Sequence, residues 1–289
     1  MAGMNGILLV DKPQDWTSHD VVAKLRGVFG ERRIGHAGTL DPMATGLLVV
    51  FVGRATKAVS FAEAREKRYL AGLRLGIVTD TQDVTGNVLS EAEQQVSREE
   101  LESALAGFRG DIDQIPPMYS AIKVKGRRLY EIARRGGEVA RTARRITIHR
   151  LDVLGSEMGD WQLDVVCSKG TYIRTLCHDI GAALGCGGTM SSLRRISVGD
   201  FSVEDAFSVE YLSTLPREEA EKLLLPVDSL FEQHPALTLG AKQERLCRNG
   251  VSFSCEAEDG VRRFYGQDGA FLMLGEVKDG TANAILRLF

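Results

Sequence analysis

The chain has 289 residues, of which 44% are hydrophobic and 26% are charged, and its formal net charge is −3. This composition predicts a globular protein with one large domain, or with one domain and a small appendage. The apolar stretches fall far short of the roughly 18 residues that a membrane-spanning helix needs, and the first residues lack a signal-peptide pattern, so we expect a cytoplasmic protein. Five cysteines without a Cys-x-x-Cys pair or zinc-finger spacing predict reduced thiols and no structural metal.

The first part of the chain alternates strand and helix patterns, separated by a glycine-rich stretch. In order, we expect a strand over 6–10, a helix from Thr17 or Ser18 to about Phe29, a loop over 34–46, a buried strand over 47–52, a helix over about 56–66 and a strand over 68–75.

The loop over residues 34–46 is suited to holding one carboxylate. Its glycines can take positive φ or allow another backbone to approach closely, while Pro42 fixes its own φ and moves Asp41 out of the α region. Asp41 would then lie in a constrained loop that leads into the core, where rigid scaffolds present catalytic groups. Taken alone, the loop is explained better by an ordinary Asp-Pro turn in which His36 satisfies a neighbouring backbone group.

The second part of the chain begins with acidic turns and ends in a region of short strands. We expect a helix from Ser97 to near Gly110, a basic amphipathic helix over 127–135, strands over 145–154 and 161–167, a helix ending near Leu184, extended chain over 189–201, and short strands over 251–253, 261–265, 270–277 and 282–288. The composition changes between residues 225 and 235, which indicates a domain boundary before a compact β appendage.

The charges are separated along the chain. Residues 121–150 contain ten Lys and Arg against two acids, a balance of +8, whereas residues 80–113 contain nine acids against two arginines, a balance of −7. One basic segment on an otherwise acidic protein fits an RNA partner whose affinity depends on salt. A solvated charged helix explains the basic segment about as well, whereas its apolar face is too thin for a membrane or calmodulin target.

Six stretches of the sequence resemble the TruB family of tRNA pseudouridine synthases. The longest, Gly-His-Ala-Gly-Thr-Leu-Asp-Pro-Met-Ala-Thr-Gly over 35–46, resembles the catalytic motif of that family. In family order, the others are Asp11-Lys-Pro13, Lys67-Arg-Tyr69, Pro116-Pro-Met-Tyr-Ser-Ala121 with the basic helix, Ser168-Lys-Gly-Thr-Tyr-Ile-Arg174 and Ser192-Leu-Arg-Arg-Ile-Ser-Val-Gly199. The resemblance covers roughly residues 6–230, and the C-terminal segment is similar to a reduced PUA-type RNA-binding domain.

The resemblance implies an α+β fold and a tRNA-modifying activity. The catalytic domain would occupy residues 1–232, with a mixed, largely antiparallel sheet and an RNA-gripping insertion at about 115–145. A small PUA-like β domain would occupy residues 233–289. The implied reaction converts a uridine in the T loop of tRNA, at position 55 in conventional tRNA numbering, to pseudouridine without cofactor or metal. The implied partner is the T stem-loop of tRNA, bound by a monomer that needs no membrane.

The resemblance also assigns catalytic roles to three residues. Breaking the C1′–N1 glycosidic bond places positive charge on the sugar, which the Asp41 carboxylate can capture covalently or relieve by taking up a sugar proton. Arg174 corresponds to the family arginine that pairs with this aspartate and keeps it ionised. Tyr69 corresponds to the tyrosine that stacks on the flipped base and can act as a base late in the reaction.

Further positions correspond to residues that hold RNA. His36, Tyr172 and Leu193 match positions that hold the flipped nucleotide or fill the space it leaves. On residue type alone, Leu193 is more simply a core residue, Tyr172 a helix-opening packing residue and His36 a turn histidine. The insertion offers cations for the RNA backbone: Lys123, Arg127, Arg128, Arg134 and Arg135.

Two functions from other classes compete with the isomerase. A tRNA-binding or RNA-chaperone protein could keep the scaffold without chemistry, although a pure binder needs none of Asp41, Tyr69 and Arg174. A glycosidase with paired acids is disfavoured, because the motif loop offers one carboxylate and no second acid beside it.

Overall fold

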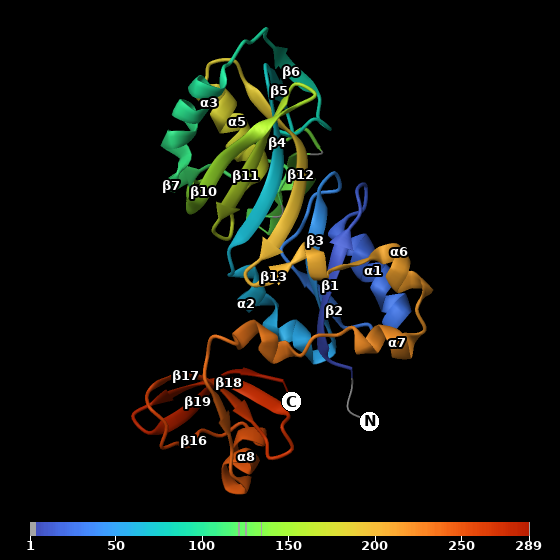
Figure 1. Ribbon diagram of the computed structural model, residues 1–289, viewed down its shortest axis with the longest axis vertical. Coiled ribbons are helices and arrows are strands. Elements are labelled where there is room, and N and C mark those ends of the chain that lie inside the picture. The colour runs from blue at the N-terminus through green and yellow to red at the C-terminus, as the bar shows by residue number, and fades with distance from the viewer. Residues whose placement is uncertain (1–3, 121, 125, 134, 289) are drawn as a thin grey trace.

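The computed structural model of the chain describes residues 4–120, 122–124, 126–133 and 135–288 (Figure 1). A ten-stranded sheet dominates it. Its strands are β1 (Gly6–Lys12), β2 (Ile34–Ala37), β3 (Thr45–Val52), β4 (Lys67–Leu75), β7 (Gly110–Gln114), β10 (Arg144–Glu157), β11 (Asp160–Cys167), β12 (Gly188–Val198), β13 (Phe201–Ser202) and β14 (Phe207–Ser208). The order is β14-β1-β3-β12-β4-β11-β10-β7, with β2 paired to β3 and β13 to β12. Only the β1–β14 and β3–β12 pairs of this sheet are parallel, so the expected mixed, largely antiparallel α+β fold is confirmed.

Helices cover the sheet on different faces along its length. They are α1 (Ser18–Phe29), α2 (Val59–Glu63), α3 (Arg98–Leu105), α5 (Ile173–Ala183), α6 (Val209–Thr214) and α7 (Arg217–Lys222), with 3-10 helices η1 (Gly53–Ala58), η2 (Ala106–Phe108), η3 (Val203–Asp205) and η4 (Val227–Phe231). None of the helices in the described ranges is long and apolar enough to cross a membrane. Figure 1 shows α1, α6 and α7 beside β1 and β3, while α3 and α5 lie with β10 and β11 in the other half of the sheet.

The position of β3 in the sheet explains its apolar sequence. Leu48 and Val50 pack in one cluster with residues of α1, whereas Val49 and Phe51 pack in another with residues of α2 and η4. A strand that is covered on both faces has no solvent side, so its sequence is continuously apolar rather than alternating. This burial anchors the end of the Asp41 loop in the core.

A separate five-stranded sheet forms near the C-terminus. Its strands are β15 (Ala236–Thr238), β16 (Phe253–Ser254), β17 (Gly260–Tyr265), β18 (Phe271–Lys278) and β19 (Thr281–Arg287), in the order β15-β17-β18-β19-β16, and helix α8 (Ala241–Arg248) lies beside them. The predicted small C-terminal β domain is therefore confirmed.

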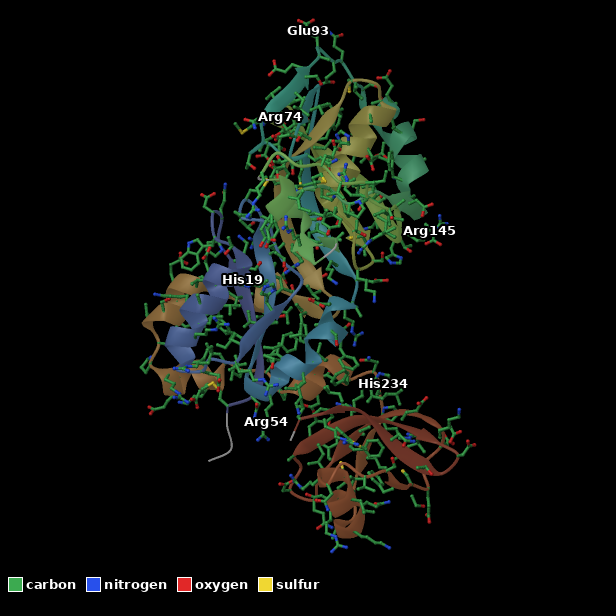
Figure 2. The ribbon with its side chains drawn as sticks, turned by 180° about the vertical axis from the view of Figure 1, so that it is seen from behind. His19, Arg54, Arg74, Glu93, Arg145 and His234 are labelled. Carbon is green, nitrogen blue, oxygen red and sulfur yellow. The ribbon has the colours of Figure 1, made fainter. Side chains whose placement is uncertain are left out.

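The small β domain packs on the 3-10 helix that leads into it. Phe231 of η4 contacts Phe61 edge-on, with ring centroids 5.2 Å apart, and Phe271 of β18 at 6.2 Å. The Tyr265 hydroxyl donates a hydrogen bond of 2.6 Å to Asp228. Figure 2 shows His234 at this junction between the two parts of the molecule.

The expected loop over residues 34–46 begins later than predicted. Its first four residues form β2, which pairs with β3 from Ile34 opposite Val52 to Ala37 opposite Val49. Gly38 and Gly46 have positive φ, at 76° and 97°, whereas Gly35 has not. The prediction was wrong for this stretch because tertiary strand pairing overrode the local preference of a glycine-rich sequence.

The expected helix over residues 56–66 was only partly correct. The segment starts as the 3-10 helix η1 and becomes α-helical only over Val59–Glu63. The Thr56 hydroxyl donates to the Gly53 carbonyl at 2.8 Å, a local bond that competes with regular helix geometry. Helices α6, α7 and α8 were not predicted from the sequence.

The expected basic helix over residues 127–135 was wrong in extent. The described part of the insertion contains β8 (Lys123–Val124), β9 (Arg127–Arg128) and the short helix α4 (Leu129–Ala133). Strands β8 and β9 pair antiparallel, and Gly126 at the hairpin turn has φ 84°. A glycine with positive φ favours a tight hairpin turn, which places Arg127 in a strand rather than in a helix.

Candidate active site

The Asp41 carboxylate lies in the loop that joins β2 to β3. The Ala44 amide donates to the Asp41 carbonyl at 3.0 Å, which closes a tight turn through Pro42. The Asp41 side chain is 37% exposed, so its carboxylate is held by the loop and remains open on one side. The loop therefore presents Asp41 as the sequence predicted.

Arg174 in the first turn of α5 pairs with Asp41. Its Nε lies 2.9 Å from Asp41 Oδ2, and its side chain is only 6% exposed. The same guanidinium donates to the backbone carbonyls of Thr81 at 2.9 Å and Tyr119 at 2.8 Å. Because an arginine fork fixes its direction through several donors at once, these carbonyls aim Arg174 at Asp41.

A second carboxylate, Asp83, also faces Arg174. Asp83 is 4% exposed, and its Oδ2 lies 3.6 Å from Arg174 Nη1. The hydroxyls of Thr81 and Thr85 donate to Asp83 at 2.9 and 2.5 Å. Sequence reasoning missed this residue, because it counted Asp83 only among the acids of segment 80–113. A turn rich in threonine around one aspartate is the local signal that could have singled it out.

The electrostatic surroundings of Asp41 act in opposite directions. Burial raises the pKa of the Asp41 carboxyl, and the negative charge of Asp83 adds to that effect. The positive charges of Arg174 and Lys12 lower the same pKa. Burial outweighs the positive charges, so the pKa of Asp41 lies above its usual value, and Arg174 limits this rise.

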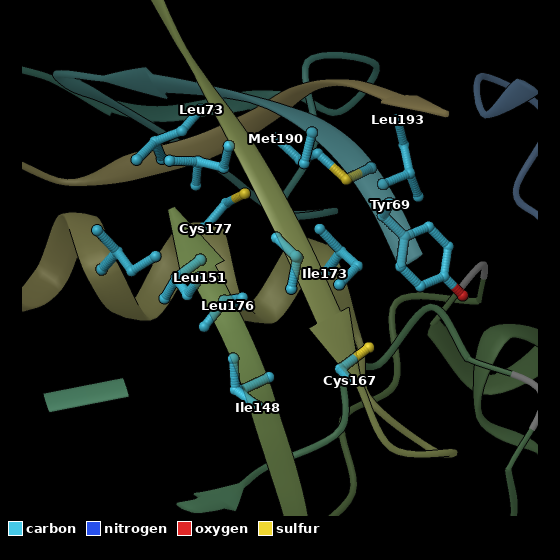
Figure 3. Packing of buried hydrophobic residues seen from close by; sticks show 14 of the residues in the cluster. Tyr69, Leu73, Ile148, Leu151, Cys167, Ile173, Leu176, Cys177, Met190 and Leu193 are labelled. Carbon is cyan, nitrogen blue, oxygen red and sulfur yellow. The ribbon is translucent and has the colours of Figure 1, made fainter. Parts of the chain in front are cut away.

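Tyr69 lies on β4 at the edge of the core nearest the loop. It is 8% exposed and shares an apolar cluster with Leu40 and Ile173. Figure 3 shows the ring beside Leu193, with the hydroxyl pointing away from the rest of the cluster. Burial raises the pKa of Tyr69, while the positive charge of Arg195 lowers it. The hydroxyl is therefore protonated at neutral pH.

Leu193 and Tyr172 lie close to Tyr69 and Arg174, respectively. Leu193 on β12 is 8% exposed and belongs to the same apolar cluster as Tyr69. Tyr172 is half-buried at the N-cap of α5, two residues before Arg174. The side-chain amide of Gln114 bonds both backbone groups of Tyr172, at 2.8 and 3.0 Å, which fixes the start of α5.

His36 on β2 is half-buried. Its Nδ1 is buried and has no hydrogen-bond partner among the described residues. Its ring meets the ring of His19 edge-on at 5.7 Å. Burial lowers the pKa of His36 to about 4, so the ring is neutral at neutral pH. A neutral ring with a free nitrogen suits a role against a nucleobase better than a role as a cation.

The basic insertion borders the site, and only part of it lies within the described residues. Its segment around Tyr119 contacts the site through the bond from Arg174 to the Tyr119 carbonyl. Arg127 and Arg135 are exposed, as a phosphate-binding role requires. The side chains of Lys123 and Arg128 lie outside the described part, and so does Arg134 as a whole. No three His, Cys, Asp or Glu side chains in the described ranges gather in a way that could hold a metal ion.

Family models match most of the chain. The model described as TruB family pseudouridylate synthase (N terminal domain) matches residues 26–173, and that described as tRNA pseudouridylate synthase B C-terminal domain matches residues 174–232. The chain belongs to the TruB family of pseudouridylate synthases. Asp41 and Tyr69 lie within the first match, and Arg174 begins the second.

Curated TruB relatives align over nearly the whole chain. A tRNA pseudouridine synthase B of Clostridium kluyveri is 42% identical, covering 96% of this chain and 96% of the relative. One of Chromobacterium violaceum is 44% identical, covering 98% and 94%. The TruB alignment therefore includes the small β domain, which the two family models do not reach.

Solved structures share the fold. The archaeal box H/ACA sRNP Nop10-Cbf5 complex contains a chain that matches with a TM-score of 0.73 at 21% identity, covering 99% of this chain and 86% of that one. A Cbf5-Nop10-Gar1 complex gives 0.73 at 24% identity, covering 99% and 85%. At this identity the likeness establishes the common fold of the TruB-type chain alone.

Proposed function

We propose that the chain isomerises a uridine of tRNA to pseudouridine, at position 55 in the T loop, as a tRNA pseudouridine synthase B. The observation that carries this proposal is the ion pair between Asp41 and Arg174, made by two residues of separate motifs that converge at 2.9 Å. A protein that only binds tRNA does not need a carboxylate held by an arginine in this way. An isomerisation moves a base from N1 to C5 attachment without net gain or loss of atoms, so the proposed chemistry requires no co-reactant.

Asp41 begins the proposed reaction at the sugar. As the C1′–N1 bond breaks, the carboxylate either bonds to C1′ or takes the proton from C2′, and the detached base keeps the bonding electron pair on N1. The base then turns and C5 attacks C1′, while the bond between Asp41 and C1′ breaks in the first route or Asp41 returns its proton to C2′ in the second. The C5 proton then leaves, and N1 gains a proton. Arg174 aims the carboxylate and balances its charge during these steps.

Tyr69 supports the base and its last proton transfer. Its ring lies at the edge of the apolar cluster beside Leu193, where a flipped base would stack. Because burial raises the pKa of Tyr69, a role as proton acceptor at C5 needs its own proton to leave during the reaction. Leu193 would wall the same pocket, Tyr172 would border it, and neutral His36 would contact the nucleotide or the space it leaves.

The tRNA would be held by two parts of the chain. The insertion at about 115–145 would bind the phosphates of the T stem-loop through Lys123, Arg127, Arg128, Arg134 and Arg135. The exposed positions of Arg127 and Arg135 support this assignment. We further propose that residues 1–232 form the catalytic domain, that residues 233–289 form a PUA-like RNA-binding domain, and that one monomer binds one tRNA.

Incubation of the purified chain with unmodified tRNA tests the activity. Nucleoside analysis should find one pseudouridine per tRNA, and a transcript in which cytidine replaces the target uridine should give none. The Asp41→Asn variant serves as the inactive control. Tight binding of tRNA with unchanged uridine would favour the tRNA-binding protein instead.

A further inference from the structure

Arg195 is a buried cation behind the Asp41 loop. It lies on β12 and is 1% exposed, one of the largest fully buried side chains of the molecule. Its neighbour Arg194 pairs with Asp11 at 2.7 Å, whereas Arg195 forms no ion pair with any carboxylate of the described residues. Burying a charge without an opposite charge costs free energy unless its hydrogen-bond donors are satisfied. The groups that accept hydrogen bonds from Arg195 therefore indicate the role of this residue.

Two of those contacts bracket the catalytic aspartate. Arg195 Nε donates to the Leu47 carbonyl at 2.6 Å, and Nη2 donates to the Gly38 carbonyl at 3.1 Å. Gly38 precedes Asp41 by three residues and Leu47 follows it by six. One guanidinium therefore ties the two ends of the loop together.

The backbone of Arg195 approaches the same loop closely. At Gly46, φ is 97°, and a Cβ there would lie 2.3 Å from the Arg195 carbonyl oxygen. Any side chain at this position would force β3 and β12 apart. The glycine of the catalytic motif thus permits the contact that brings the Arg195 side chain under the loop.

Arg195 also lies opposite Tyr69. The two residues are cross-strand partners on β12 and β4, so their side chains leave the same face of the sheet. The positive charge of Arg195 lowers the pKa of Tyr69 against the effect of burial. A guanidinium has only donors, so toward Tyr69 it can act only as a donor to the phenolic oxygen.

We propose that Arg195 is a positioning residue that fixes the Asp41 loop and the Tyr69 hydroxyl relative to each other. This proposal rests on the proposed function, because it deepens the account of the same site. Asp41 and Tyr69 come from different elements, and Arg195 is bonded to the loop and is the cross-strand partner of the tyrosine. Lysine does not reproduce it, because the donors of an ammonium all leave one nitrogen atom, whereas the guanidinium carries its donors on separate nitrogens of a planar fork.

Arg195→Lys is the primary variant, because it keeps the buried charge and some donors. Arg109→Lys is the matched control, since the Arg109 guanidinium also donates to a backbone carbonyl, that of Leu151, at 2.6 Å but away from the site. We expect Arg195→Lys to lower the single-turnover rate constant at saturating protein by at least about tenfold, the scale of a misplaced catalytic group, with tRNA affinity within about threefold. The Arg109→Lys variant should turn over at the wild-type rate.

A double-variant cycle tests the link to Tyr69. In a Tyr69→Phe background the hydroxyl is absent, so Arg195→Lys should reduce the remaining rate by a clearly smaller factor than in the wild type. An equal factor in both backgrounds would overturn the proposal, and so would a wild-type rate in Arg195→Lys.

Hydrogen exchange separates this proposal from the proposed function. We expect amides in residues 34–47 to exchange faster in Arg195→Lys while the remainder of the sheet keeps its protection, and Arg109→Lys to leave residues 34–47 unchanged. Unchanged exchange over 34–47 in Arg195→Lys would overturn the positioning role. If the wild-type protein formed no pseudouridine, the proposed function would be wrong, but the hydrogen-exchange difference over residues 34–47 would still be expected. If Arg195→Lys failed to fold, Arg195→Gln and Arg195→Met would be measured by the same exchange experiment, and global loss of protection in all three would overturn a local role.

Discussion

The guanidinium of Arg174 lies 2.9 Å from the Asp41 carboxylate, although 133 residues separate the two in the chain. The pair forms where the first turn of α5 meets the loop between β2 and β3. Arg174 contacts both carboxylate oxygens, with Nε 2.9 Å from Oδ2 and Nη2 3.4 Å from Oδ1, while the Asp41 side chain stays 37% exposed. This arrangement predicts that chemistry and tRNA binding can be separated at Asp41.

Asp41→Asn should abolish turnover and leave tRNA affinity within a few fold. The amide keeps nearly the same volume but is a poor nucleophile and base. We expect the single-turnover rate constant to fall by far more than the roughly 100-fold that lesser catalytic aids contribute. Asp200→Asn, at a carboxylate that is 88% exposed, is the control and should retain the wild-type rate. Retention of more than about a hundredth of the rate by Asp41→Asn would exclude both proposed roles of the carboxylate.

Arg174→Lys should slow catalysis severely even though the charge is kept. A lysine cannot contact Asp41, Asp83 and two backbone carbonyls together, so the orientation of the Asp41 carboxylate would no longer be fixed. We expect a loss of about 100-fold or more in the single-turnover rate constant, typical of a lost charge-assisted contact at the reacting group. Arg74→Lys is the matched control, because Arg74 also forms a forked pair, with Asp160 at 2.8 and 3.0 Å, away from the site. Equal effects of the two substitutions would argue against a special role for Arg174.

The main strands and the turn that holds Asp41 could be predicted because their signals are local, whereas the pairing of residues 34–37 with β3 could not. The apolar run of β3 and the turn chemistry around Pro42 are properties of neighbouring residues, and the structure has both. The threonine-rich turn marks Asp83 locally, but its contact with Arg174 could not be predicted, because that contact depends on how the turn after residue 79 packs against α5. The burial of Arg195 also depends on tertiary packing. Arg194 and Arg195 are adjacent arginines in the sequence, and only the pairing of β12 decides which side chain faces the core.

The extents of the helices were less predictable for a related reason. The sequence of the basic insertion predicts one amphipathic helix. In the structure, the turn at Gly126 forms a hairpin, and the short helix α4 of five residues follows it. Short helices such as α6 and α7 owe their stability to packing against α1 and β1, which no local pattern reports.

His36 should make the stability of the fold depend on pH. Burial lowers the pKa of His36 from 6.5 to about 4 in the folded state, so between these values the unfolded chain binds more protons. The free energy of unfolding that His36 contributes is thus fully present above pH 6.5 and is lost as the pH falls toward 4. Urea denaturation at a series of pH values should show this decline, and His36→Gln should flatten it. The exposed His149→Gln is the control, and an equal flattening by both variants would contradict the burial of His36.

Neutralising Arg127, Arg128, Arg134 and Arg135 together should weaken binding to every tRNA alike. If these side chains contact phosphates, each lost contact should reduce the slope of log affinity against log salt by about 0.7 to 0.9. Affinities measured at several salt concentrations give this slope. A matched control neutralises four surface cations that are paired with acids: Arg98, Arg109, Arg217 and Lys222. An unchanged slope in the insertion variant would place the insertion away from the RNA.

Tyr69 offers a test that separates its ring from its hydroxyl. Tyr69→Phe should spare much of the tRNA affinity, because base stacking, worth about 1 to 3 kcal/mol in single-strand binders, survives on the phenyl face. Tyr69→Ala should weaken both binding and turnover. Tyr172→Phe is the control for a nearby tyrosine hydroxyl that has no proposed part in proton transfer, and its rate should stay close to that of the wild type.

The rate of Tyr69→Phe decides whether the hydroxyl carries a proton. Because burial raises the pKa of Tyr69, little phenolate is present at neutral pH, and its fraction grows tenfold with each pH unit below that pKa. If phenolate takes the C5 proton in the slow step, the wild-type single-turnover rate should rise with pH above 7, and the Phe variant should be severely slowed and lose that rise. Single-turnover measurements at saturating protein remove the binding contribution. A Phe variant that turns over near the wild-type rate would leave Tyr69 as a stacking platform, because the ring alone would then account for its place in the site.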